Sequence, residues 1–152
     1  MRKILPPVLF LIFAAAMALI CWAMGSPHNL AFPANLAGMV LLVSGLGISA
    51  YHSRLFRQLG TNIMTFDEPG TLVTAGMFRY SRNPMYLGFV LALLGLAVLY
   101  QAAVSSLLLV LLFWLVADRW YIRFEEAAML AKFGDACRAY CQVTPRWIGL
   151  VK

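Results

Sequence analysis

Residues 79–88 read RYSRNPMYLG, a cationic polar turn that enters a long apolar stretch. The run 83–117 contains no Asp, Glu, Lys or Arg, and neither does the run 4–53. The chain is 62% hydrophobic and 12% charged, about half the charged fraction of an average soluble domain. A soluble core would not leave two such runs without charge, so the sequence predicts a membrane protein.

Each uncharged run has room for two membrane-spanning helices, because one transmembrane helix needs roughly 20 apolar residues. We predict spans at about 6–24, 33–51, 84–100 and 104–121, with reversals at 25–29 and 100–103. The fold class is therefore all-α: a polytopic membrane protein with four transmembrane helices and a C-terminal cytoplasmic amphipathic helix. No repeat or linker interrupts the chain, so we expect one domain over residues 1–152.

Every Lys and Arg lies at the N-terminus, in the middle loop, or at and after the end of the fourth predicted span. The positive-inside rule places these regions, and both termini, in the cytoplasm. This rule and attraction to anionic lipid explain the net charge of +6, so we expect no nucleic-acid partner. Alternatively, Arg2 and Lys3 open a cleaved signal peptide ending near residues 23–25. The length of the run and the charge symmetry disfavour that alternative.

The cysteines and histidines do not predict a metal site. Cys21, Cys137 and Cys141 form neither a zinc pattern nor a CxxC motif. Cys137 and Cys141 lie one helical turn apart on the reducing side, so we expect no disulfide. His28 and His52 lie at opposite ends of the second span, and we expect both to be polar residues of the membrane interface.

Two further segments carry local signals. Gly45 and Gly47, in the second span, indicate close helix packing rather than a nucleotide-binding loop. The loop 52–81 is long for a segment with no function, and a turn is predicted at 67–70. After the fourth span the chain stays helical, with a stop at Phe133 and Gly134 and a short second helix capped by Asp135.

The start of the third span predicts an anion site. Proline is favoured at the first helical position, so Pro84 begins the helix and Asn83 or Ser81 caps it. Free backbone N–H groups, the helix dipole and the Arg82 guanidinium converge there, as a carboxylate or phosphate site requires. The alternative is that Arg82 only anchors the helix among lipid headgroups.

Glu125 and Glu126 form an acidic pair after the fourth span. Adjacent carboxylates near a bilayer are costly unless they are paired or solvated. Arg119 and Arg123 could neutralise them; alternatively, one carboxylate binds an ammonium or ribose group and the other positions a substrate or acts as a base. Neighbouring helical residues point about 100° apart, so we do not expect both to face one ligand.

These segments together resemble a known family. The runs 70–78 and 82–88, the acidic pair, Phe133 with Gly134, and Tyr140 are similar to the isoprenylcysteine carboxyl methyltransferases. The related phospholipid methyltransferases share the C-terminal half. The resemblance covers about 70–147 and implies an integral membrane enzyme that uses S-adenosylmethionine, with its cofactor-binding part at 70–147 and variable helices at 1–53.

The resemblance also implies site residues. We expect the cofactor to contact Thr71, Leu72, Val73, Phe78, Asn83, Pro84, Met85, Tyr86 and Glu125. We expect the catalytic residues to be Arg82, Glu125 and Glu126. The substrate-binding candidates are Arg119, Arg123, Tyr121 and Tyr140.

Three positions depart from the family pattern. Asn83 replaces the commoner His, and Cys137 stands where a Tyr often precedes Tyr140. Tyr121 appears where enzymes with prenyl substrates carry a substrate-contacting Arg. The last departure weakens the expectation of a prenylcysteine carboxylate as the acceptor.

The chemistry of these residues and the family resemblance indicate the same activity. Methyl transfer from a sulfonium needs alignment of donor and nucleophile and exclusion of water. We therefore predict an S-adenosylmethionine-dependent membrane methyltransferase with a lipophilic acceptor: an isoprenylcysteine-like carboxylate, a thiol or another lipid-soluble group. We expect the donor, a lipophilic or lipid-linked substrate and membrane lipids as partners, and no metal.

Two alternative functions remain open. The first is a phospholipid N-methyltransferase, which keeps the donor and changes the acceptor. The second is a non-catalytic membrane transporter or assembly protein. A transporter is expected to carry an ionisable residue at mid-membrane depth, and the four predicted spans offer none.

Overall fold

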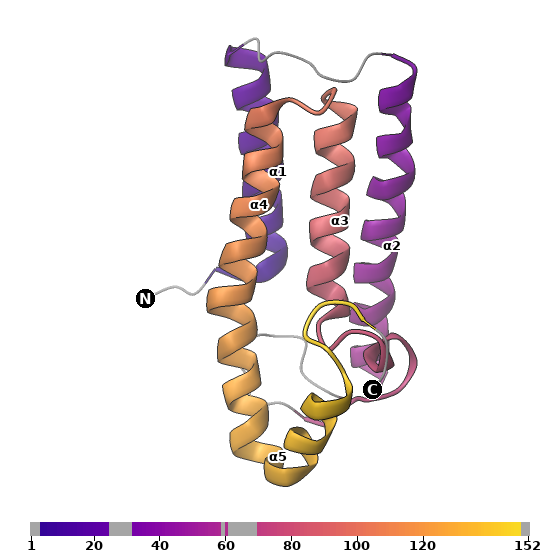
Figure 1. Cartoon of the computed structure of the whole chain (residues 1–152), viewed down its shortest axis with the longest axis vertical. Coiled ribbons are helices and arrows are strands. Elements are labelled where there is room, and N and C mark those ends of the chain that lie inside the picture. The colour runs from indigo at the N-terminus through magenta and orange to yellow at the C-terminus, as the bar shows by residue number, and fades with distance from the viewer. Residues whose placement is uncertain (1–3, 25–31, 59, 61–69, 150–152) are drawn as a thin grey trace.

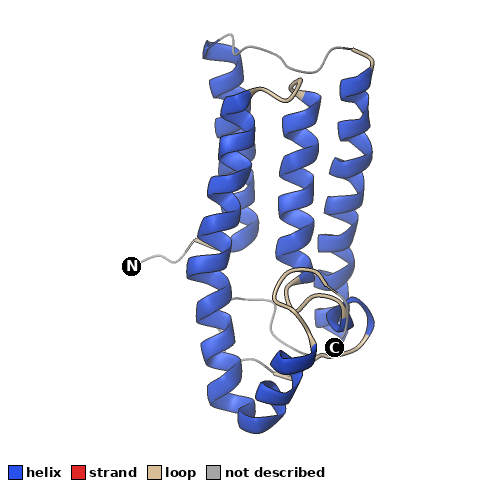
Figure 2. Cartoon of the chain, viewed as in Figure 1, coloured by secondary structure: helices blue, strands red, loops and turns tan. Residues whose placement is uncertain are grey.

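The computed structural model describes residues 4–24, 32–58, 60 and 70–149 (Figure 1). Within these ranges every regular element is helical and no strand occurs (Figure 2), which confirms the all-α prediction. The main helices are α1 (Pro6–Met24), α2 (Ala37–Gln58), α3 (Pro84–Leu99), α4 (Val104–Val116) and α5 (Arg123–Val143). Short 3₁₀ turns cover Ala34–Leu36 and Gly76–Arg79, and a π-helix, η3, covers Ala117–Ile122.

Among the described residues, three helical segments are long and apolar enough to cross a membrane: Pro6–Ala23, Ala34–Gln58 and Val104–Val143. The helix α3 is apolar but has 16 residues, and its length of about 24 Å falls short of the roughly 30 Å hydrocarbon core. Large apolar side chains face outward, as the exposed fractions of Leu11 (63%) and Val40 (69%) illustrate. Such a surface suits lipid rather than water, and the chain is consistent with an integral membrane protein.

The helices α1, α2, α3 and α4 stand side by side, and α5 folds below one end of them (Figure 1). Large side chains from α1, α3 and α4 form the core, including Met17, Leu93 and Phe113, each with no exposed surface. Phe10 stacks on Phe89 with ring centroids 5.2 Å apart. Burial of these side chains holds α1, α3 and α4 together.

A seam of glycines joins α2 to α3. Gly38 and Gly45 on α2 face Gly95 and Gly88 on α3, respectively. A Cβ atom added to Gly45 would lie 2.5 Å from the carbonyl oxygen of Gly88, so only glycine allows this approach. Close packing was predicted for Gly45 and Gly47; it is confirmed for Gly45, whereas Gly47 faces open space.

The helix α2 corrects two predictions. It continues to Gln58, past the predicted end at residue 51, and its last turns pack on Phe78 through His52 and Phe56. His52 was expected at the interface, yet it is completely buried. Its Nδ1 lies 2.8 Å from the carbonyl oxygen of Ile48, and its ring meets that of Phe78 edge-on. The expectation was wrong because packing against residue 78 is a tertiary contact.

The backbone stays helical from α4 through η3 into α5, and Gly134 then turns it back. A π-helical turn changes the register of the residues that follow and is frequent at functional sites. Gly134 has φ 50°, so the predicted stop is confirmed as a kink inside α5. The predicted reversal at 100–103 is also confirmed, with positive φ at Gln101 and Ala102. The predicted turns at 25–29 and 67–70 lie outside the described residues.

Candidate active site

A cavity of about 610 Å³ opens at the end of the bundle where α3 begins. Its walls come from the start of α1, the end of α2, residues 71–73, the start of α3 and both arms of α5, which are its parts before and after the Gly134 kink. All the residues expected to bind the cofactor line it: Thr71, Leu72, Val73, Phe78, Asn83, Pro84, Met85, Tyr86 and Glu125. Arg82, Glu126 and Tyr140 line it as well.

The start of α3 has the predicted backbone but not the predicted cap. Asn83 occupies the cap position and Pro84 the first helical position, yet no side chain caps the helix. The Asn83 side-chain N–H₂ donates instead to the carbonyl oxygen of Arg146 at 3.0 Å. Ser81 accepts a hydrogen bond from the Asn83 backbone N–H at 3.1 Å. The capping prediction was wrong because a distant segment takes the amide.

That distant segment is residues 144–149, which we call the C-terminal strap. The backbone N–H of Arg82 donates to the carbonyl oxygen of Pro145 at 3.0 Å, and that of Gly149 donates to Tyr80 at 3.2 Å. Just before the strap, the Tyr140 hydroxyl donates to the carbonyl oxygen of Phe78 at 2.7 Å. These bonds fasten the end of the chain across the start of α3.

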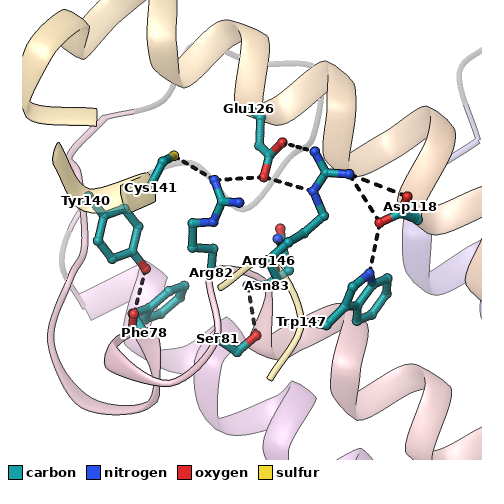
Figure 3. A network of polar contacts seen from close by, with 10 residues as sticks. All are labelled: Phe78, Ser81, Arg82, Asn83, Asp118, Glu126, Tyr140, Cys141, Arg146 and Trp147. Carbon is teal, nitrogen blue, oxygen red and sulfur yellow. Dashed lines mark hydrogen bonds and ion pairs between the residues drawn. The ribbon is translucent and has the colours of Figure 1, made fainter. Parts of the chain in front are cut away.

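Arg82 and Arg146 meet on the carboxylate of Glu126 (Figure 3). Arg82 Nη1 lies 3.1 Å from Glu126 Oε1, and Arg146 Nε donates to the same oxygen at 3.2 Å. Arg146 Nη2 contacts the other oxygen, so the Arg146–Glu126 pair is bidentate, the strongest form of such a pair. Its hydrogen bond to Glu126 raises the pKa of Arg146 above its ordinary value, so the guanidinium stays charged.

Arg146 also reaches Asp118 on η3, at 3.3 Å from Oδ1, and therefore bridges two carboxylates. The Trp147 indole N–H donates to Asp118 at 2.8 Å. The sequence offered Arg119 and Arg123 as partners of the acidic pair, but Arg119 lies against Asp118 at 3.6 Å. In the described part of the chain, Arg82 and Arg146 are the cations that neutralise Glu126, because the strap brings Arg146 back to α5.

Glu125 has a different environment from its neighbour. It accepts a hydrogen bond from the Tyr86 hydroxyl at 2.7 Å. The two adjacent carboxylates therefore contact different partners, as their angular separation predicts. Both nevertheless line the same cavity.

The Arg82 side chain is 16% exposed. Its Nη1 also donates to the sulfur of Cys141, whereas its buried Nε has no hydrogen-bond partner among the described residues. A buried donor without a partner costs about 1–3 kcal/mol. The Arg82 residue also lines the cavity, so its guanidinium charge fits an anionic ligand group.

The substrate-binding candidates separate into two sets. Tyr140 lines the cavity. Tyr121 is buried in the bundle, where its hydroxyl donates to the carbonyl oxygen of Ile4 at 2.8 Å. Arg119 and Arg123 are exposed and do not line the cavity. Their contact with a substrate stays a prediction.

Sequence reasoning missed Arg146, Asp118 and Cys141. The sequence signal for Arg146 was the motif Pro145-Arg146-Trp147, in which a charged residue lies between a proline and an aromatic residue directly after a helix end. In the structure Trp147 packs on Trp114, with ring centroids 5.9 Å apart.

Comparison with known proteins shows the family of this chain. The phospholipid methyltransferase family profile matches residues 34–136, from the start of the α2 segment into the second arm of α5. The chain belongs to this family. It is 38% identical over 80 residues to the protein-S-isoprenylcysteine O-methyltransferase of Schizosaccharomyces pombe, which covers 53% of the chain and 34% of that relative. The chain therefore spans about a third of the relative's length. No solved structure matches.

Proposed function

We propose that the protein is an S-adenosylmethionine-dependent membrane methyltransferase with a lipophilic acceptor. The observation that carries the proposal is one cavity that joins the Arg82–Glu126 ion pair and the Tyr86–Glu125 hydrogen bond to residues 71–73. Membership of the phospholipid methyltransferase family supports a methyl-transfer reaction at this cavity.

The chemistry of the cavity wall fits the donor. Arg82, which lines the cavity, would hold the donor carboxylate. Glu125 would hold the ammonium group or ribose hydroxyls. Phe78 stacks on Phe56 with centroids 5.4 Å apart, and this apolar wall suits the adenine ring. We assign the remaining cofactor contacts to Thr71, Leu72, Val73, Asn83, Pro84, Met85 and Tyr86.

The bound donor supplies a methyl group on a positively charged sulfur, and the chain supplies alignment and exclusion of water. Glu126 holds the Arg82 guanidinium toward the donor, and Arg146 holds Glu126. A carboxylate acceptor is ionised at neutral pH and needs no base. A thiol or amine acceptor must lose a proton in the reaction.

The acceptor has two candidates. The name of the yeast relative favours an isoprenylcysteine-like carboxylate, and the name of the family favours a phospholipid amine. We favour the lipid-linked carboxylate and keep Tyr140, Tyr121, Arg119 and Arg123 as candidate contacts. Incubation of lipid extracts and a prenylcysteine analogue with methyl-labelled donor separates the two, because label enters only the true acceptor.

We further propose four spans, with α3 as a short span and with both termini and α5 in the cytoplasm. Residues 1–152 would act as one domain whose cofactor-binding part is 70–147. The ends of α1, α2 and α3 that line the cavity all face α5, where the cationic residues gather, which supports this topology (Figure 1). Reporter fusions at both termini that faced opposite sides of the membrane would overturn it.

The direct test is calorimetric titration of the detergent-purified protein with S-adenosylhomocysteine. We expect saturable binding at one site per chain. Folded protein that shows no binding at millimolar ligand would reject the proposal. A non-catalytic transporter or assembly role instead predicts that Arg82→Ala and Glu125→Gln leave cellular function intact.

A further inference from the structure

A pair of thiols lies in the cavity wall, and the proposed reaction does not use it. Cys137 and Cys141 occupy the second arm of α5, after the Gly134 kink, and both line the cavity. Residues four apart on a helix share a face, with Cβ atoms about 5–6 Å apart. Both thiols are free, and neither forms a disulfide.

The pair is connected directly to the proposed donor site. The sulfur of Cys141 accepts a hydrogen bond from Arg82 Nη1, the same nitrogen that pairs with Glu126 (Figure 3). Cys137 lies deeper, with 4% of its surface exposed. Any group bound to both sulfurs would therefore lie against the guanidinium that we assign to the donor carboxylate.

We propose that Cys137 and Cys141 form a dithiol site for a soft trivalent arsenic centre, and that its occupation closes the donor site. The second half of this statement rests on the proposed function. Two sulfurs on one helical face bind a thiophilic centre as a chelate, and thiol ligands select soft centres over hard ones. The cavity has room for an arsenical with one aryl group, and its wall beside Phe78 is apolar.

The binding step conserves oxidation states. Phenylarsine oxide, C₆H₅AsO, reacts with the two thiols to form two As–S bonds. The As–O bonds break, the two thiol protons join the oxygen, and one water leaves. Arsenic stays trivalent and the sulfurs are not oxidised. A competing dithiol such as 2,3-dimercaptopropanol reverses the reaction by taking arsenic into its own chelate.

The experiment treats the detergent-purified full chain with phenylarsine oxide, followed by a wash with glutathione, which removes arsenic held by one thiol. Intact-mass spectrometry then counts the adduct, and calorimetry measures S-adenosylhomocysteine affinity. Cys137→Ala and Cys141→Ala each remove one sulfur. Cys21→Ala is the matched control, because Cys21 is the one cysteine outside the pair and lies in α1. Helicity by circular dichroism confirms that each variant is folded.

We expect wild type and Cys21→Ala to keep one adduct, and Cys137→Ala and Cys141→Ala to keep none. The adduct should weaken S-adenosylhomocysteine binding about tenfold or more, since it displaces a charge-assisted contact, and 2,3-dimercaptopropanol should restore binding. An adduct retained in Cys141→Ala, or wild type that takes none, would overturn the site. Unchanged S-adenosylhomocysteine affinity in the protein that carries the arsenic adduct would overturn the proposal that the adduct closes the donor site.

The two proposals fail in different ways. If untreated wild type binds no S-adenosylhomocysteine, the proposed function is rejected, and the mass measurement still decides the dithiol site. If untreated wild type binds the ligand and takes no adduct, only the dithiol site is rejected.

Discussion

The two regions that hold α3 in place use opposite means. Along its length, α3 packs on α2 through glycines, and the contacts are between backbones. At its first turn, α3 is held by ion pairs and hydrogen bonds from the C-terminal strap and α5. The seam tolerates no added atom, whereas the polar end lines the cavity. Backbone packing therefore fixes the position of α3, and its first turn presents charged groups at the cavity.

The largest expected effect comes from breaking the seam. Gly45→Leu places a side chain where even a Cβ would lie 2.5 Å from backbone atoms of α3. Because the backbone cannot move aside, we expect a loss of about 3 kcal/mol or more in stability, or no folded protein. Thermal unfolding in detergent measures the effect.

Gly47→Leu is the matched control for the seam, because a Cβ there meets no atom within 4 Å. We expect its melting temperature to stay near that of wild type. Equal destabilisation by the two substitutions would contradict the account of the seam.

The next effect comes from the polar end. Arg82→Ala removes the cation assigned to the donor carboxylate and should raise the donor KM about tenfold or more, with a smaller effect on melting temperature. Arg79→Ala, at an exposed arginine three residues away, serves as control. An unchanged donor KM in folded Arg82→Ala protein would remove the carboxylate-binding role.

Arg146→Ala tests whether the strap positions Glu126. We expect weaker S-adenosylhomocysteine binding by about 1–2 kcal/mol, since Glu126 and Asp118 both lose a guanidinium. Arg146→Lys should recover part of the lost S-adenosylhomocysteine affinity, because Lys restores the charge and not the bidentate contact. Arg138→Ala, which removes an exposed pair with Asp135, should change nothing. Equal affinity in the Ala and wild-type proteins would show that the strap is only structural.

The smallest effect is expected at Tyr86. Tyr86→Phe removes the hydroxyl that donates to Glu125 and keeps the ring. Loss of one hydrogen bond of this kind is worth about 0.5–1.5 kcal/mol, or roughly two- to tenfold in donor affinity. Calorimetry on the variant measures it, and a hundredfold loss would indicate that the hydroxyl has a larger role than orienting Glu125.

Much of the site could be predicted because its signals are local or belong to a family pattern. Pro84 marks the start of α3, Gly134 marks a break, and the segments 71–73 and 82–86 follow the family order. The boundary of α2 and the burial of His52 could not be predicted, since both depend on what packs against the helix end. The partners of Glu126 were also misjudged, because sequence proximity favoured Arg119 and Arg123.

The sequence by itself determined the all-α class, the apolar segments that suit a membrane, the family and the segments that meet at the cavity. Helix-forming patterns, charge-free runs and turn residues act over a few positions, so they can be read along the chain. Only the tertiary structure decided that Arg146 pairs with Glu126, 20 residues away, and that Asn83 donates to the strap, 63 residues away. Such contacts depend on where the Gly134 kink and the π-turn direct the chain, and no local pattern encodes that direction.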